Sequence, residues 1–219
     1  KSELFNDLVF KDNFADNHPF KKMIVRIRPE IVTFGKKIGL ENKAPYVKPR
    51  QLQEWIKNKE VILLDTRNNY ESKIGKFENA ITPKINVFTE WKNFVDNLDL
   101  PKNTKIVTYC TGGIRCEKAS AYLKKKGFSQ VYQLHGGIIK YGKVVGKNHW
   151  EGKCFVFDKR IAIDIDPKNV SQPITHCVHC RLPTSHYHNC TLIKCDKLFI
   201  CCTNCLQELE GCCSKNCRN

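Results

Sequence analysis

No stretch of this sequence approaches the roughly 18 consecutive apolar residues that a membrane-spanning helix needs. The opening residues Lys1-Ser2-Glu3-Leu4-Phe5 also lack the apolar region of a secretory signal peptide. We find no internal repeat, no low-complexity tract and no dinucleotide-binding glycine fingerprint. These absences favour a cytoplasmic protein that has no membrane contact and no nucleotide cofactor of the common kind.

Basic residues are abundant. There are 37 Lys and Arg against 22 Asp and Glu, a formal net charge of +15. A surface of this charge attracts polyanions, of which nucleic acid is the commonest in the cytoplasm. The basic residues are spread along the chain without one Arg-rich tract. Composition therefore favours nucleic-acid contact without separating RNA from DNA, and the alternative is a merely basic protein.

The thirteen cysteines are unevenly placed, since ten of them fall between Cys177 and Cys217. The other three are Cys110, Cys116 and Cys154. Disulfide scaffolds belong to exported proteins, and no export signal is present here. The distribution therefore predicts a metal-binding tail on a domain that uses cysteine for chemistry.

Five segments are expected. Residues 1–40 contain two strand-like runs, 23–28 and 31–34, which are too little for a core. We interpret this segment as the end of an α+β domain, and an arm packed on the following domain is the alternative. A proline-containing linker at 41–49 leads into residues 50–145, where helical and strand patterns alternate. That alternation predicts an α/β domain with a mainly parallel sheet. A hairpin or connection at 146–175 and a small Cys-rich lobe at 176–219 complete the chain.

Within the α/β segment the patterns place individual elements. A continuous apolar run at 61–64 and another at 106–109 predict buried strands, and a third strand is expected at 131–134. Apolar residues at helical spacing predict helices near 52–56, over 88–98 and over 116–126. The aromatic residues of the second helix are interpreted as core. A hairpin is expected from 154–157 and 161–163.

Cys110 stands where the strand at 106–109 meets the following helix. At this end of a parallel strand, free backbone N–H groups and the positive end of the helix dipole converge. Gly112 and Gly113 let the backbone wrap closely, and Arg115 adds positive charge. We predict that Cys110 is a thiolate nucleophile with a pKa below the usual value of about 8.5. The alternative is a buried, inert cysteine before a glycine-rich turn.

The loop Cys110-Thr111-Gly112-Gly113-Ile114-Arg115 resembles the active-site loop of the rhodanese family, and Asp65-Thr66-Arg67 matches the family's Asp-x-Arg element. The resemblance covers about residues 50–145. It implies that Cys110 carries a persulfide held by the amides of residues 111–115, with Asp65 and Arg67 supporting the loop. Four residues separate Cys110 from Arg115, whereas the related cysteine phosphatases have five.

Three more side chains are expected to lie near the loop. Arg67 and Glu71 are expected to form an ion pair that supports it. Cys116 either packs in the first turn of the helix or resolves an oxidised Cys110.

Further stretches resemble one rhodanese subfamily, the bacterial tRNA uridine hydroxylases. They are Asp65–Glu71, Cys110–Ala119, His135–Tyr141 and Trp150–Arg160. The resemblance implies a tRNA substrate, 5-hydroxyuridine as the product at wobble position 34, and molecular oxygen as co-substrate. It also implies an N-terminal domain of which residues 1–40 are the last part. We see no two-histidine-one-carboxylate iron motif, so the means of oxygen activation is not visible.

The tail has the spacing of metal sites. Cys177-x-x-Cys180 and Cys202-x-x-Cys205 are separated by 21 residues, as in sites with four thiolates. A second, interleaved site is expected from Cys190 and Cys195 with two of three later cysteines, for which we select Cys212 and Cys217 over Cys213. Structural zinc is the candidate metal, and disulfide-linked or reduced cysteines are the alternative.

Three functional hypotheses follow. The first is an RNA-modifying enzyme that hydroxylates a tRNA uridine through Cys110. The second is a thiosulfate or persulfide sulfurtransferase, for which the same loop suffices. The third is a non-catalytic RNA-binding module in which the tail is the functional part.

Overall fold

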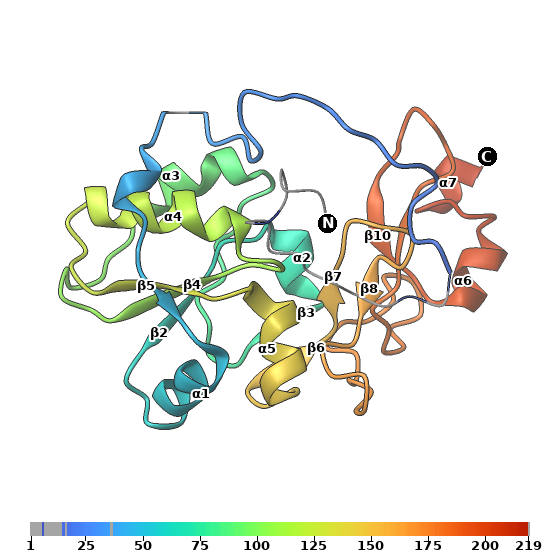
Figure 1. Cartoon of the computed structure of the whole chain (residues 1–219). Helices are drawn as coiled ribbons and strands as arrows, with labels where there is room; N and C mark the ends of the chain where they lie inside the picture. Colours follow the sequence, from blue (N-terminus) through green and yellow to red (C-terminus); the bar gives the residue numbers. More distant parts are fainter. Residues whose placement is uncertain (1–5, 7–14, 16, 36, 219) are drawn as a thin grey trace.

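A four-stranded parallel sheet forms the centre of the structure, a computed structural model that describes residues 6, 15, 17–35 and 37–218 (Figure 1). The strand order is β1-β5-β4-β2. The strands are β1 (Tyr46–Val47), β2 (Ile62–Asp65), β4 (Ile106–Tyr109) and β5 (Val131–Leu134). This architecture confirms the α/β class and the parallel sheet that were predicted from the alternating pattern.

Helices cover both faces of the sheet (Figure 1). One face carries α3 (Trp91–Asp96) and α4 (Ile114–Lys125), with the 3-10 turns η2 (Leu40–Asn42) and η3 (Phe88–Glu90); the other carries α1 (Pro49–Lys57) and α5 (Gly137–Val145). Successive strand residues point to opposite faces. Leu64 therefore packs under α3 and α4, while Leu63 packs under α1 and α5.

The predicted helices are largely confirmed, with changed bounds. The helix expected over 88–98 is divided into η3 and α3, and its aromatic residues are core, because Phe88 and Trp91 are buried. The helix expected from Cys116 starts two residues earlier, at Ile114. It ends before Gly127, whose φ of +90° requires glycine-like freedom.

Beyond the sheet, short antiparallel pairs extend the fold. Helix α2 (Asn69–Lys73) precedes β3 (Gly75–Phe77), which pairs with β6 (Trp150–Gly152). The expected hairpin is present as β7 (Cys154–Phe155) and β8 (Ala162–Ile163). The C-terminal lobe contains β9 (Tyr187–Asn189), β10 (Leu198–Ile200), α6 (Thr203–Glu208) and α7 (Lys215–Arg218).

The segment predicted as a linker, 41–49, belongs to the sheet instead. Its residues 46 and 47 form β1, which pairs in parallel with β5. Ala44 and Val47 are buried, and the Ala44 carbonyl accepts a hydrogen bond from the buried Gln133 amide. Pro45 and the polar residues around it suggested a linker, because a two-residue strand is too short to show alternation.

The strand-like runs 23–28 and 31–34 form no strand in the described part of the chain. Met23, Val25 and Ile27 are 92%, 86% and 103% exposed, so the alternating pattern is present but nothing described here pairs with it. The segment contacts the rest of the fold at separate points: the Lys159 N–H donates to the Pro19 carbonyl at 3.2 Å, and Phe34 is fully buried under α3 and α4. Most of residues 1–16, which belong to the expected domain end at 1–40, lie outside the described residues.

The C-terminal lobe packs against α2 and β7. Tyr187 of β9 and Ile200 of β10 share a small buried cluster with Ile74 and Phe155. The Tyr187 hydroxyl also donates a hydrogen bond of 2.9 Å to the carbonyl of Tyr70 in α2. The lobe is therefore fastened to the helix that follows strand β2.

Among the helices in the described ranges, none has the length and apolarity needed to cross a bilayer.

Candidate active site and metal-binding groups

Cys110 directly follows β4 and lies at the carboxyl end of the sheet. Every residue of β4 is buried, and Cys110 itself is 1% exposed. Its carbonyl accepts a hydrogen bond of 3.0 Å from the N–H of Ile138, and the carbonyl of Thr111 accepts one of 3.2 Å from the N–H of Ile139. The first turn of α5 thus holds one side of the loop, and α4 begins on the other side.

The sulfur of Cys110 is stabilised as a thiolate. The Gly113 N–H donates to Cys110 Sγ at 3.1 Å, at a φ of +90° that suits glycine. A hydrogen bond from the Cys116 thiol, the charge of Arg115 and the N–H groups of Arg115 and Gly113 together lower the pKa of Cys110 to about 5, although burial acts in the opposite direction. At neutral pH the side chain is therefore an anion.

Cys116 lies next to Cys110 and forms a hydrogen bond with it, besides packing in the helix as expected. It is fully buried in the first turns of α4, and its sulfur lies 3.8 Å from the hydroxyl oxygen of Thr66. Burial is the largest cause that raises the pKa of Cys116 well above its ordinary value. The hydrogen bond to Cys110 and the negative charge of Cys110 raise it further. Cys116 therefore keeps its proton and acts as a hydrogen-bond donor to the Cys110 thiolate.

The ion pair expected between Arg67 and Glu71 is wrong. The carboxylate of Glu71 instead holds Arg115 in a bidentate contact, with Arg115 Nη2 at 2.7 Å from Oε2. Glu71 is fully buried and also accepts from the Asn68 N–H, which caps α2. Arg115 thus contributes its charge to the cysteine loop while being fixed to α2, 44 residues earlier in the chain.

Arg67 pairs with Asp65, the other predicted supporting residue. Arg67 Nη2 lies 2.7 Å from Asp65 Oδ2, and the same nitrogen donates to the carbonyl of Gly75 at 2.7 Å. Both side chains are fully buried. Asp65 ends β2 opposite Tyr109, the residue before Cys110. The pair therefore joins β2 to β3 directly beside the cysteine loop.

Gly137, which follows the strand at 131–134, governs how closely α5 approaches the loop. A Cβ at this position would lie 2.4 Å from the Cys110 carbonyl oxygen and 2.6 Å from that of Thr111, and its φ is +65°. We expect Gly137→Ala to destabilise the fold on the order of 2–4 kcal/mol and to distort the loop. Urea unfolding measures the first effect.

Gly112→Ala is the matched control within the same loop. A Cβ there meets nothing within 4 Å. We expect its stability to stay within about 0.5 kcal/mol of the parent. Equal destabilisation of the two variants would show that the close approach of α5 to the loop does not require glycine at position 137.

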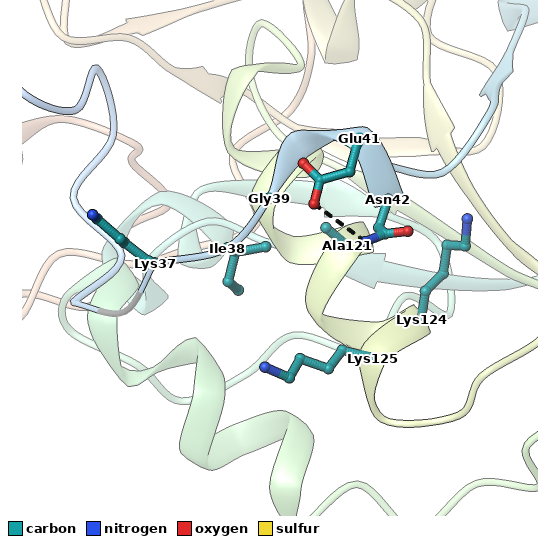
Figure 2. A pocket seen from close by; sticks show the side chains of 8 residues that line it. All are labelled: Lys37, Ile38, Gly39, Glu41, Asn42, Ala121, Lys124 and Lys125. Carbon is teal, nitrogen blue, oxygen red and sulfur yellow. Dashed lines mark hydrogen bonds between the residues drawn. The ribbon is translucent and has the colours of Figure 1, made fainter.

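One cavity lies away from Cys110. Its volume is about 470 Å³, and Figure 2 shows its lining around the far end of α4: Lys37, Ile38, Gly39, Glu41, Asn42, Ala121, Lys124 and Lys125. It contains none of the predicted site residues. We therefore assign no chemistry to it.

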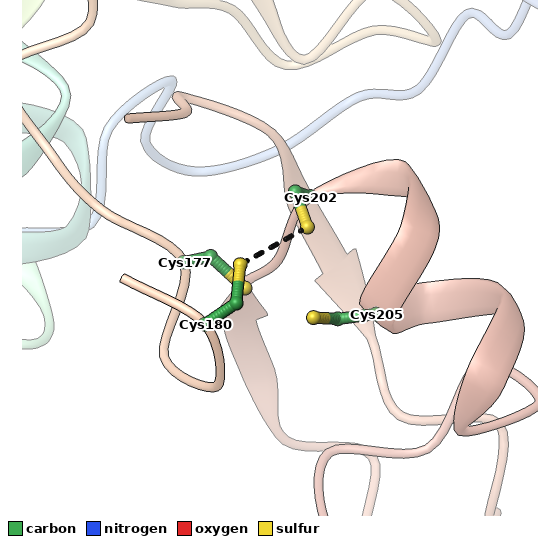
Figure 3. A group of neighbouring side chains, drawn as sticks. All are labelled: Cys177, Cys180, Cys202 and Cys205. Carbon is green, nitrogen blue, oxygen red and sulfur yellow. Dashed lines mark hydrogen bonds between the residues drawn. The ribbon is translucent and has the colours of Figure 1, made fainter. Parts of the chain in front are cut away.

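The cysteines of the tail gather into two groups, each able to hold a metal ion. In the first, the sulfurs of Cys177, Cys180, Cys202 and Cys205 lie within 4.8 Å of one another, and Figure 3 shows them converging from a turn and from the start of α6. The second group unites Cys190, Cys195, Cys213 and Cys217 in the same way.

The second group corrects one predicted ligand, because Cys213 takes the position expected for Cys212. The sulfur of Cys212 is directed elsewhere, 3.2 Å from the Thr191 hydroxyl and 3.3 Å from the Cys217 carbonyl oxygen. Spacing alone does not reveal which of two adjacent cysteines faces the other ligands.

Comparison with known proteins agrees with this geometry. Residues 48–143 match the model of the rhodanese-like domain, and residues 151–218 match that of the rhodanase C-terminal region. The rhodanese-like domain of a protein from Anabaena shares 21% identity and a TM-score of 0.43, covering 66% of this chain and 98% of that one. The match over residues 48–143 shows that the parallel sheet and its cysteine loop form a rhodanese-like domain.

Two curated relatives are considerably more similar. The tRNA uridine(34) hydroxylase of Chlamydia abortus is 42% identical over 97% of this chain and 67% of its own length. The enzyme of the same name from Chlamydia trachomatis serovar L2 is 42% identical over 97% of this chain and 66% of its own length. The chain belongs to the tRNA uridine(34) hydroxylase family and spans about two thirds of the length of these relatives.

Proposed function

We propose that this protein hydroxylates uridine 34 of tRNA to 5-hydroxyuridine, with Cys110 as the catalytic residue. The observation that carries the proposal is the buried Cys110 thiolate, held by the Gly113 N–H, within a chain of this family. A thiolate in a cradle of N–H groups is a strong nucleophile that can also hold a sulfur-bearing or anionic intermediate. Cytoplasmic tRNA is the expected substrate.

The proposal includes dioxygen as co-substrate and a persulfide on Cys110 as the reacting sulfur. The loop supports the persulfide, since it has four residues between Cys110 and Arg115. Asp65 and Arg67 serve as positioning residues beside it, and residues 50–145 form the catalytic unit. Separately from the reaction, we propose that Cys177, Cys180, Cys202 and Cys205 bind structural zinc.

The charge and one exposed aromatic residue support an RNA substrate. The net charge of +15 favours contact with the phosphate backbone. Phe157 is 61% exposed, and its ring lies 5.8 Å from the Arg115 guanidinium carbon, beside the cysteine loop. Enzymes that act on a nucleobase commonly stack the unpaired base on an aromatic side chain. Sequence reasoning missed Phe157, because its neighbour Arg115 is 42 positions away.

We expect Phe157→Ala to lower kcat/KM for tRNA by about 5-fold or more, since stacking on one base contributes about 1–3 kcal/mol. Phe157→Tyr keeps the ring and is expected to retain most of the activity. Quantifying 5-hydroxyuridine by mass spectrometry over a range of tRNA concentrations measures both variants. Unchanged kcat/KM in Phe157→Ala would show that the base does not contact this ring.

A sulfurtransferase is the second candidate, favoured by the same loop length. It predicts efficient sulfur transfer from thiosulfate to cyanide without RNA. A non-catalytic RNA-binding module is disfavoured by the lowered pKa of Cys110.

The decisive experiment complements a strain lacking its own hydroxylase with the parent chain or Cys110→Ala. Nucleoside analysis of its tRNA then measures 5-hydroxyuridine. Normal levels with Cys110→Ala would refute the proposed function.

A further inference from the structure

The sulfurs of the C-terminal lobe are spaced for metal coordination. The closest contacts between sulfurs within the two groups are 3.5 Å for Cys180 and Cys202 and 3.7 Å for both Cys195–Cys213 and Cys213–Cys217. Four thiolates at a zinc–sulfur distance of about 2.3 Å lie about 3.8 Å apart at the corners of a tetrahedron. A disulfide requires about 2.05 Å. All thirteen cysteines are free.

The lobe has little other core of its own, since its buried Tyr187 and Ile200 pack against Ile74 and Phe155 outside the lobe. Its buried cluster consists of cysteines and Phe199, and Leu206 is the one partly buried residue packed there that is not a cysteine. Burial of so few apolar side chains contributes less free energy than the conformational entropy lost when a segment of this size folds. A bound metal supplies the missing free energy, since folding of small metal-binding lobes is driven by ligation.

The two groups also share a backbone feature. The residue after the second cysteine of each early pair has positive φ: Arg181 after Cys180, at +65°, and Asp196 after Cys195, at +41°. Backbone N–H groups also face one sulfur of each group: those of Cys180, Cys202 and His179 face Cys177, and those of Cys213, at 3.4 Å, and Leu192 face Cys190. The two groups thus resemble each other in their backbone surroundings.

We infer that the lobe binds two zinc ions in a cross-braced arrangement. The first and third cysteine pairs along the chain, Cys177/Cys180 and Cys202/Cys205, hold one ion. The second and fourth pairs, Cys190/Cys195 and Cys213/Cys217, hold the other. Four thiolates leave no open position, so both ions are structural. Because each ion closes a loop that contains a pair from the other site, losing one ion weakens the binding of the other.

Neighbouring cysteines provide matched variants. Cys213→Ser removes a ligand, whereas Cys212→Ser removes the adjacent sulfur, which is directed at Thr191. Elemental analysis of the purified full chain is expected to give two zinc ions per chain for the parent and for Cys212→Ser. Cys213→Ser is expected to lose the second ion and part of the first. One ion per chain in the parent, or equal loss in the two variants, would overturn the assignment.

Two measurements on the parent chain keep the test valid if Cys213→Ser fails to fold. Replacing zinc with cobalt is expected to give thiolate-to-cobalt charge-transfer bands that saturate at two cobalt ions per chain. Alkylation after denaturation in chelator, without reductant, is expected to modify all thirteen cysteines. Saturation at one cobalt, or modification of fewer cysteines in steps of two, would contradict the two-ion lobe. These readouts are independent of uridine hydroxylation, so either proposal can fail without the other.

Discussion

Cys110→Ala is expected to reduce 5-hydroxyuridine formation on the order of 10³-fold or more, because removing a catalytic nucleophile eliminates the step that depends on it. Nucleoside mass spectrometry of tRNA treated with purified protein measures the loss. Cys154→Ala is the matched control, since Cys154 is also fully buried but burial raises its pKa to about 12, which keeps it protonated. Comparable loss in both variants would show that any buried sulfur matters.

The pH dependence of Cys110 alkylation tests the cause of its reactivity. Its pKa of about 5 lies below the unperturbed value of about 8.5, so the thiolate is fully present above about pH 6 and is lost as the pH falls through 5. Removing the thiol donor in Cys116→Ala is expected to move the midpoint upward. Cys116→Ser keeps a donor and is expected to move it less. A parent midpoint of about 8.5 would favour the scaffold interpretation.

Glu71→Ala is expected to destabilise the protein by about 3–5 kcal/mol, the usual cost of leaving one member of a buried ion pair without its partner. The Glu71 side chain is fully buried, and that of Arg115 is 11% exposed. The substitution also removes one of the two hydrogen bonds of the capping box of α2, the one from the Asn68 N–H to the Glu71 carboxylate. Urea unfolding measures the loss, and the alkylation rate of Cys110 reports whether the released Arg115 still stabilises the thiolate.

Two comparisons separate the causes. Glu71→Gln retains a side chain that can cap α2, so it isolates the loss of charge. Glu117→Gln breaks the exposed pair with Lys43 and is expected to cost no more than about 1 kcal/mol. If Glu71→Ala proved as mild as Glu117→Gln, the buried pair would not be what holds the loop to α2.

The sequence was sufficient to predict those features that depend on residues close together along the chain. The buried strand at 106–109, the glycine turn and the helix that follows are contiguous, so the position of Cys110 and the lowering of its pKa were predictable. The same holds for the cysteine pairs Cys177/Cys180 and Cys202/Cys205, whose spacing is visible directly. Strand β1 was missed because two residues carry no periodic pattern.

Contacts between distant residues were decided only by the tertiary structure. Glu71 is four residues from Arg67, which suggested an ion pair between them. Strands β2 and β4 are neighbours in the sheet, so α2, which follows β2, lies beside the start of α4, which follows β4. Glu71 therefore pairs with Arg115, 44 residues further along the chain. Cys212 and Cys213 have nearly the same spacing to every other ligand, and only the path of the lobe directs Cys213 inward. Local patterns predicted the position of Cys110 and its surroundings along the chain. Packing determined which distant residues contact its loop and which cysteines gather into groups that can bind metal.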